Sequence, residues 1–560
     1  MSSLEQYWPS LEHSTECLRT EAETVDEALL LAVHEPTTLL RRAAQTSAEV
    51  AADEVALLTE LMRPVTDGSA VVIAITGASG VGKSHMVRWL RAQLERHPRR
   101  QDLVVVSIPK TASLRRVVEL ILEPLASEEY EALKRELARS SEQLTPSTAS
   151  ELLAAALGEG LKEYRDRTAE IVQAAPNENS SLRPHVAVAE HARSLIQAPE
   201  VREMWLSKVL QRIVGASLGG ASNPSDRQFS AEDLTPPQHA VGQELPQRVQ
   251  MALAFLGNAN GRFRITAADI LQEVLDGALR TVFRVTEALQ QKSIQDVVDD
   301  IRRQLLKDDK ELVLLIEDLA ALSGIQQPLL DIMIAESDEH GKRVRAPIRT
   351  AVAVTDGFLA GRQTVLTRAK EQWVVPSEGL AEDAILNKLI DLTGRYLNAA
   401  RWGVKRLKLE FAQSSHSNSN LYAWVPKFDH PLDASDAESL DSFGQSRQGY
   451  SLFPFNANAI RGLAISAMKQ GGVWNYNPRA FINEVLRKTL SERPAFLSKQ
   501  FPPIGFKSPH LVAEVRTQLQ RKGYTQDQAQ KLEVALHFWA GSPNSLAVPT
   551  VPRAVFETFS

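Results

Sequence analysis

The 560-residue sequence contains a single cysteine, Cys17, and no long apolar run. A single thiol excludes an internal disulfide, which favours a reducing compartment such as the cytoplasm. No apolar stretch approaches the roughly 18 residues typical of a membrane-spanning helix, so no membrane partner is expected. The start, "MSSLEQYWPSLEHSTE", is polar and acidic, which argues against a secretory signal. The sequence therefore predicts a soluble cytoplasmic protein.

Excess positive charge is also lacking. The formal net charge of −6 provides no general field for holding nucleic acid, so any such surface would be a local patch. Apolar residues make up 43% and charged residues 24%, values typical of globular proteins. A chain of this length is too long for one hydrophobic core, so two to four domains are expected.

Short apolar segments, the candidate strands, are separated by long stretches with a helical pattern. These segments lie at residues 69–77, 102–109, 311–318, 349–356 and 372–376. Apolar strands that alternate with helices predict an α/β fold, in which helices cover both faces of a parallel sheet.

A glycine-rich stretch follows the first predicted strand. Residues 77–84, "GASGVGKS", fit the pattern G-x-x-x-x-G-K-[ST] of a phosphate-binding loop, and a helical pattern follows at once. Such a loop aims backbone N–H groups at an anion, which also meets the positive end of the helix. In this pattern Lys83 reaches the β- and γ-phosphates and Ser84 offers its hydroxyl to Mg²⁺. The predicted nucleotide-contacting residues are Gly77, Ala78, Ser79, Gly80, Val81, Gly82, Lys83, Ser84 and His85.

Two acids end the third predicted strand, in "ELVLLIEDLAAL". A phosphate-binding loop needs a second strand that brings a carboxylate to the metal, and a further acid can polarise the attacking water. The stretch resembles a Walker B strand, which usually ends in Asp then Glu, but here the order is reversed. By position, Glu317 would hold Mg²⁺ and Asp318 would act on the water. Their lengths leave the exchanged roles open, and the reversal predicts slow hydrolysis.

The motifs after this strand resemble, in their order, those of the AAA+ ATPases, close to the initiator and helicase-loader branch. "RTAVAVTD" is similar to the strand whose polar tip senses the γ-phosphate, so the resemblance assigns that role to Thr355 or Asp356. "GGVWNYNPRAFINEVLRKTL" is similar to the lid helix that carries a nucleotide-sensing arginine, here Arg479. Asn477 can cap this helix, and Pro478 suits its first turn.

The same resemblance assigns an arginine finger, which acts on a neighbouring subunit's nucleotide, to Arg368 in "VLTRAKEQWVVP". A finger of this kind implies a homo-oligomer. The rival candidates are Arg343, Arg345, Arg349 and Arg362.

The spacing departs from the family, because Lys83 and Asp318 are 235 positions apart (318 − 83 = 235). A helical insertion between the second and third strands accounts for the excess, and insertions at surface loops often carry function. The predicted divisions are an N-terminal helical segment (1–54), a P-loop ATPase core (55–125 and 305–376), the insertion (126–304), a helical lid (377–500) and a C-terminal helical segment (501–560), a candidate start of a further region.

More distantly, "ITGASGVGKSHMVRWL", "SIPKTASLRRVVELIL" and "ELVLLIEDLAALSGIQ" resemble large bacterial ATPases of anti-phage defence, encoded beside DNA-modification and restriction genes such as the 7-deazaguanine clusters. This resemblance implies a protein partner encoded nearby, with DNA as a further candidate. The expected function is assembly or remodelling of a partner, driven by ATP with Mg²⁺, in such a DNA-associated or defence system. The alternative is a signalling switch, in which nucleotide binding gates oligomerisation and turnover is negligible.

Replacement of Arg368 by alanine tests the arginine finger. Such fingers stabilise charge on the transferred phosphoryl group and are worth roughly 10³ to 10⁵ in rate in other NTPases. We expect Arg368→Ala to bind ATP normally and to lose nearly all steady-state turnover. Mixing it with a Lys83→Ala protein should restore activity, because each variant supplies the part that the other lacks. Turnover independent of protein concentration, in a demonstrated monomer, would contradict the assignment.

Overall fold

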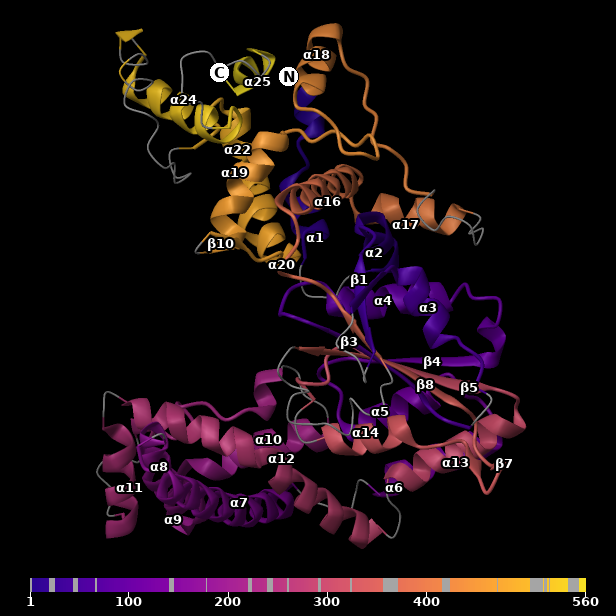
Figure 1. The fold of residues 1–560 in the computed structure, drawn as a ribbon, viewed down its shortest axis with the longest axis vertical. Helices are drawn as coiled ribbons and strands as arrows, with labels where there is room; N and C mark the ends of the chain where they lie inside the picture. The colour runs from indigo at the N-terminus through magenta and orange to yellow at the C-terminus, as the bar shows by residue number, and fades with distance from the viewer. Residues whose placement is uncertain are drawn as a thin grey trace.

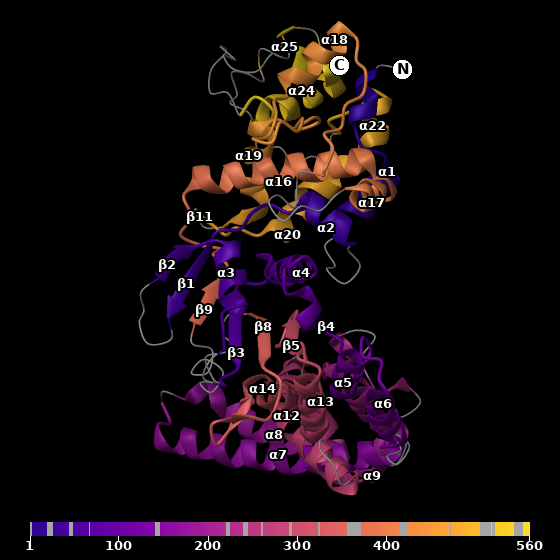
Figure 2. The same ribbon diagram turned by 90° about the vertical axis from the view of Figure 1, so that its right-hand side faces the viewer.

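A computed structural model of the chain shows a central sheet between two mainly helical regions, a lid on one side and an insertion on the other (Figure 1, Figure 2). The structure describes residues 3–19, 26–43, 49–65, 68–140, 146–177, 179–219, 224–238, 245–258, 261–290, 294–322, 325–355, 371–414, 424–470, 472–503, 517, 521–522, 524–541 and 553–559. Within these ranges, no helix is long and apolar enough to cross a membrane.

The central sheet has seven strands, five of them parallel. The parallel strands, in sheet order, are β9 (Glu371–Val374), β3 (Val71–Gly77), β8 (Ile348–Thr355), β5 (Glu311–Ile316) and β4 (Leu103–Ile108). Beyond β9 the sheet continues with β1 (Leu39–Ala43) and β2 (Glu49–Ala52), which are antiparallel. The predicted α/β fold with a largely parallel, helix-covered sheet is confirmed.

Helices bury both faces of this sheet. Alternate residues of β3, such as Val72 and Ala74, share a core with α5 (Leu114–Leu122), α13 (Ile294–Lys307) and α14 (Gln326–Ile334). The residues between them face the opposite core, which includes α3 (Glu54–Leu61) and α4 (Lys83–Leu94). Side chains alternate along a strand, so a strand covered on both faces must be apolar throughout.

The predicted N-terminal helical segment (1–54) contains two strands as well as helices. Residues 39–43 and 49–52 form β1 and β2, and β1 pairs with β9, more than 300 residues away in the chain. The short stretch "LLRRA" shows no clear alternation of apolar and polar residues, and its strand conformation depends on pairing with that distant strand. The preceding elements η1 (Ser3–Tyr7), α1 (Leu11–Cys17) and α2 (Glu27–Val33) pack in the core of the lid.

The insertion between β4 and β5 is helical where the structure describes it, and it shares the hydrophobic core on the α5 side of the sheet. A buried arginine joins the two parts. The Arg227 guanidinium donates to the carbonyl oxygens of Thr111 (2.7 Å) and Ala112 (2.6 Å), directly after β4. The insertion elements before α13 are α6 (Glu128–Ser140), α7 (Pro146–Ala174), η4 (Ser180–Leu182), α8 (Arg183–Gln197), α9 (Pro199–Val201), η5 (Arg202–Leu206), α10 (Ser207–Gly219), η6 (Pro224–Arg227), α11 (Gln247–Gly257) and α12 (Arg262–Gln290).

The lid begins after β9 and has its own apolar core. Its longest helix, α16, spans the width of the region in Figure 2. The described elements are α16 (Glu382–Trp402), α17 (Val404–Gln413), α18 (Ala434–Ser442), α19 (Ala457–Met468), β10 (Lys469–Gln470), β11 (Val473–Trp474), α20 (Pro478–Phe481), η9 (Ile482–Arg487), α21 (Lys488–Ser491) and α22 (Arg493–Leu497). The C-terminal segment contributes α24 (Gln526–Phe538) and α25 (Arg553–Phe559), which pack in the same core.

A buried arginine anchors the amino end of β8. Arg349 is 1% exposed, and its guanidinium bonds the Glu311 carboxylate (2.6 Å) and the carbonyl oxygens of Leu61 (2.9 Å) and Arg63 (2.7 Å). We expect Arg349→Ala to lower the free energy of unfolding by about 3 kcal/mol, since it removes one of the two arginines paired with Glu311 and leaves the carbonyl oxygens of Leu61 and Arg63 without this donor. Urea denaturation measures this loss. The control, Arg91→Ala on the exposed side of α4, should change it by less than about 0.5 kcal/mol; equal losses would contradict the anchoring role.

Candidate functional site

The carboxyl ends of four parallel strands meet at one edge of the sheet. Gly77 at the end of β3 pairs with Thr355 at the end of β8. Directly after β5, the N–H of Glu317 donates to the carbonyl of Ile108 in β4 (3.2 Å). In the sheet order, β4 lies on one side of β3 and β9 lies on the other. The connection from β3 therefore leads to one side of the sheet, and the connection from β8 leads back past β3 to the other. Sheets of this type bind ligands at such an edge.

The glycine-rich loop lies at this edge, between β3 and α4, so the strand and helix that its pattern requires are present. Gly80 has a φ of 86°, and a side chain there would collide with Asn477 of the lid. The buried Lys83 ammonium donates to the carbonyl oxygens of Gly77 (2.7 Å) and Ala78 (2.7 Å), and therefore lies along the loop. The positive end of α4 faces the same space.

The two acids after β5 lie across from the start of α4, and both line the cleft beside the loop. The Ser84 hydroxyl donates to the backbone oxygen of Glu317 (3.2 Å). The Glu317 carboxylate accepts from Arg88 Nε (2.8 Å), in a contact that the sequence analysis missed. The Asp318 carboxylate accepts from the N–H of Ala320 (3.1 Å), which closes a local turn.

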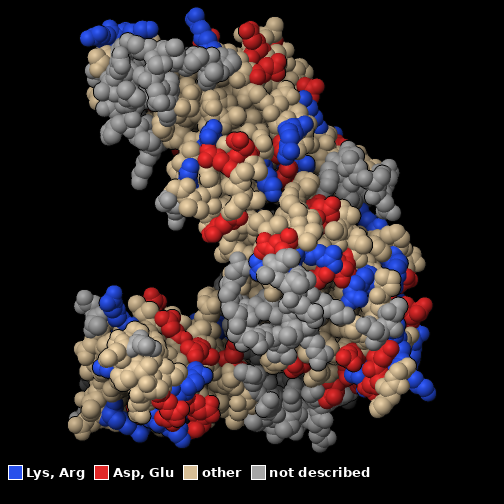
Figure 3. Space-filling view, in the orientation of Figure 1, with Lys and Arg blue, Asp and Glu red and all other residues tan. Residues whose placement is uncertain are grey.

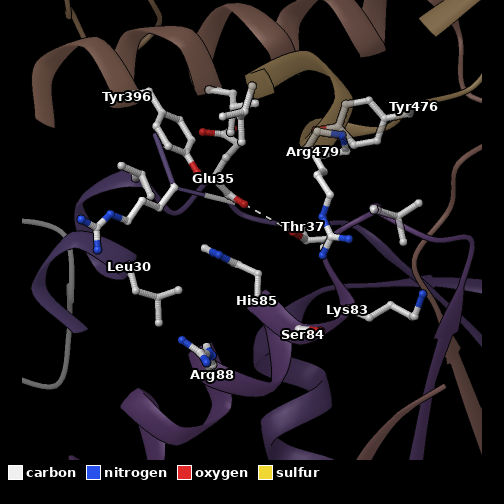
Figure 4. A pocket seen from close by; sticks show the side chains of 18 of the residues that line it. Leu30, Glu35, Thr37, Lys83, Ser84, His85, Arg88, Tyr396, Tyr476 and Arg479 are labelled. Atoms are coloured by element: carbon white, nitrogen blue, oxygen red, sulfur yellow. Dashed lines mark hydrogen bonds between the residues drawn. The ribbon is translucent and has the colours of Figure 1, made fainter. Parts of the chain in front are cut away.

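The cleft has three walls, which come from distant parts of the chain (Figure 4). One wall is the phosphate-binding loop with the start of α4. The second is α2 and the loop after it, which contribute Leu30 and Thr37. The third is the lid, which contributes Tyr396, Tyr476 and Arg479, and the Arg479 side chain extends toward the loop. Apolar and aromatic walls beside an anion-binding loop suit a ligand with a flat base and a phosphate chain.

The start of the lid helix contacts the phosphate-binding loop directly. Asn477 caps α20 by accepting from the N–H of Ala480 (3.0 Å), as predicted, and Pro478 occupies the first turn. The Asn477 amide also donates to the carbonyl of Ser79 (3.2 Å). The N–H of Arg479 points at the carbonyl of Gly80 (3.4 Å), and its guanidinium extends into the cleft.

A hydrogen-bonded row of side chains joins the N-terminal segment to α4. His85 Nε2 lies 2.9 Å from His34 Nδ1, and His34 Nε2 lies 2.9 Å from the Glu54 carboxylate. Burial, with smaller effects of His34 and Arg88, lowers the pKa of His85 to about 3, so this ring is neutral at pH 7. His85 lines the cleft and is thus available as a neutral polar group.

The cleft also carries opposite charges that sequence reasoning missed. Glu35 pairs with Arg395 (2.8 Å), and Lys388 from α16 lines the same space. Burial raises the pKa of Glu35, an effect that Arg395 opposes, and burial lowers the pKa of Lys388. No local motif marks these residues, because they meet only when the lid packs on the N-terminal segment.

The remaining predicted residues divide into two groups. Thr355 ends β8 and lines the cleft between the loop and the two acids. Asp356, Arg362 and Arg368 lie outside the described residues, so their roles stay predictions.

Three rival finger arginines are engaged within the chain. Arg343 pairs with Asp338 (3.1 Å) and Arg345 with Asp299 (2.6 Å), whereas Arg349 is buried at the amino end of β8. That end of the sheet is opposite the phosphate-binding loop. Because a finger acts on the nucleotide of a neighbouring subunit, these three arginines stay rival predictions.

The fold and the site together define a P-loop NTPase domain. Residues 66–178 match a protein-family model described as an AAA domain, and the match covers about a fifth of the chain. It contains the phosphate-binding loop and α4 and ends just after α7, so β5 and its two acids lie beyond it. Neither the curated proteins nor the solved structures contain a match.

Asn477→Ala tests the contact between the lid and the loop. The substitution removes a helix cap, worth about 1 kcal/mol, and the bond to Ser79. We expect ATP to bind at least about threefold more weakly in titrations with a fluorescent analogue. Asp433→Ala, which removes the cap of α18, is the matched control and should leave binding unchanged. Equal effects of the two substitutions would show that lost helix stability, not the loop contact, is responsible.

Proposed function

We propose that the cleft binds ATP with Mg²⁺, that the chain hydrolyses it slowly, and that the nucleotide state sets the position of the lid. One observation carries this proposal: the lid helix is bonded to the phosphate-binding loop through Asn477, and its Arg479 enters the same cleft. A change at the γ-phosphate would therefore act on both elements. Lid movement of this kind can assemble or remodel a partner.

The residues present fit a magnesium ion. Mg²⁺ prefers hard oxygen ligands and is usually held by one or two carboxylates together with substrate phosphates. The Ser84 hydroxyl and one carboxylate of the acid pair, Glu317 or Asp318, are such ligands, and all three residues line the cleft. When bound, the ion would neutralise charge on the β- and γ-phosphates.

The chain's own groups supply the remaining chemistry. The N–H groups of residues 77–85 and the ammonium of Lys83 bind and orient the phosphates. One acid of the pair after β5 accepts a proton from the attacking water. Thr355, at the tip of β8, holds this water or the γ-phosphate, and Arg479 distinguishes ATP from ADP. We include Asp356 as an alternative to Thr355, and Arg368 as the finger of a homo-oligomer.

Surface charge bears on the kind of partner. On the face shown in Figure 3, basic and acidic side chains are interspersed over the coloured surface. Arginines of the basic stretch 88–100 are engaged by acids of this chain, for example Arg96 by Glu27 (2.6 Å) and Arg99 by Glu311 (2.7 Å). This favours a protein partner over DNA. We also propose that the chain belongs to the initiator and helicase-loader branch and acts in anti-phage defence, as the sequence resemblances suggest.

A nucleotide-gated switch with negligible turnover is the second candidate. The observation that favours it is the ion pair between Glu317 and Arg88, since it occupies one of the two acids that hydrolysis would use. Turnover separates the two: a remodelling ATPase cycles and is stimulated by its partner, whereas a switch retains its nucleotide.

Lys83→Ala tests the nucleotide site itself. Lys83 is the cation that the loop motif aims at the β- and γ-phosphates, and its removal should weaken ATP binding at least tenfold while the fold survives. Isothermal titration with ATP and Mg²⁺ measures the affinity, and circular dichroism checks the fold. The control Lys162→Ala, on an exposed position of α7, should match the wild type. Wild-type affinity in the Lys83 variant would remove the basis of the proposed function.

A further inference from the structure

We propose that Arg88 is a positioning residue: it holds the Glu317 carboxylate away from the metal site and so leaves Asp318 as the acid that faces the ion. This inference rests on the proposed ATP site and deepens it, because it assigns a role to each of the two acids whose order is reversed.

The first observation is the placement of Ser84 and Arg88 on α4. Residues four apart share one face of a helix and lie about one turn, roughly 5.4 Å, apart along its axis. Because α4 starts at the phosphate-binding loop, Arg88 lies one turn farther from the phosphates than Ser84. Figure 4 shows the same order, with Arg88 beyond Ser84 and away from Lys83.

The second observation is how Glu317 lies against that helix face. Its backbone is held on two sides, by the N–H bond to Ile108 (3.2 Å) and by the bond that its carbonyl accepts from Ser84 Oγ (3.2 Å). Its carboxylate accepts from Arg88 Nε at 2.8 Å. The side chain therefore runs along α4, from the level of Ser84 to the level of Arg88, away from the loop.

The ion pair is built into the protein interior rather than made at its surface. The side chains of Arg88 and Glu317 are 16% and 7% exposed. A buried pair of this kind is costly to separate, since each charge would be left without its counter-ion. Arg88 thus neutralises Glu317 and restricts it to one position.

The reversed order of acids agrees with this arrangement. Glutamate has one methylene more than aspartate, and this extra length lets an acid whose backbone bonds Ser84 reach a guanidinium one turn away. Asp318 is shorter, and its described hydrogen bond, from Ala320 N–H (3.1 Å), is local. Both acids line the cleft, as do Arg88, Ser84 and Thr355. The Glu317 carboxylate is turned to Arg88, whereas the described bond of the Asp318 carboxylate comes from a backbone N–H, so the shorter acid is the one that can meet the ion.

The test measures how strongly Mg²⁺ tightens nucleotide binding. The dissociation constant of fluorescently labelled ATP is determined in EDTA and in saturating Mg²⁺, and the ratio of the two constants reports the metal site. We expect Asp318→Asn to lower this ratio at least about tenfold, and Glu317→Gln to keep it within about threefold of the wild type. In Arg88→Ala the released Glu317 gains access to the ion, so the ratio should rise at least about threefold.

Three controls make the outcome decisive. Arg88→Lys keeps the counter-ion and should retain the wild-type ratio, and Arg88→Ala combined with Glu317→Gln should return to it. Arg91→Ala, an exposed arginine of the same helix, should have no effect. The inference would be overturned if Glu317→Gln lost the metal effect, whether or not the separate Asp318→Asn variant also lost it. If the wild type binds no nucleotide in either buffer, the proposed function fails instead.

Discussion

The turn that joins β3 to α4 is the constraint on which the rest of the site depends. It must reverse the chain tightly at the carboxyl edge of the sheet and leave its backbone N–H groups directed at an anion. Gly80 adopts a left-handed conformation there, and the absence of its side chain leaves room for Asn477 of the lid. In the proposed function, the same turn binds the anion and leaves room for the lid helix that senses it. The turn also fixes the positions of Lys83 and Ser84, because these are the first two residues of α4.

Around this turn, segments from three parts of the chain form one cleft. The N-terminal segment packs in the lid core and is also tied to α4, through His34 and His85. The lid in turn rests on the loop through Asn477. A ligand between these walls would contact all three at once, which is the physical basis proposed for coupling the nucleotide to lid position. The insertion, by contrast, is anchored behind β4 through Arg227 and lies on the opposite side of the sheet from the lid.

The sequence predicted the parts that have a local signature. The loop over residues 77–84 is recognisable because its glycines and lysine stand at fixed spacing, and β5 because its apolar run ends in two acids. The cap at Asn477 was also predictable, since Asn before Pro is a frequent helix start. The strand conformation of residues 39–43 was not, because it depends on pairing with β9. Glu35 and Lys388 carry no motif, and they meet only through tertiary packing. Arg88 lay within reach of sequence reasoning, because it stands four residues after Ser84 on the same helix face.

The most direct test of the central claim, one nucleotide cleft with three walls, is amide hydrogen exchange of the whole chain with and without ATP and Mg²⁺. Binding should slow exchange together in three separate regions: residues 29–37, the loop and start of α4 at 77–88, and the lid residues 476–482. Exchange in α8, within the insertion and outside the cleft, should stay the same. Protection confined to the loop would contradict a cleft closed by the lid and the N-terminal segment, and protection in none of the three regions would contradict the site as a whole.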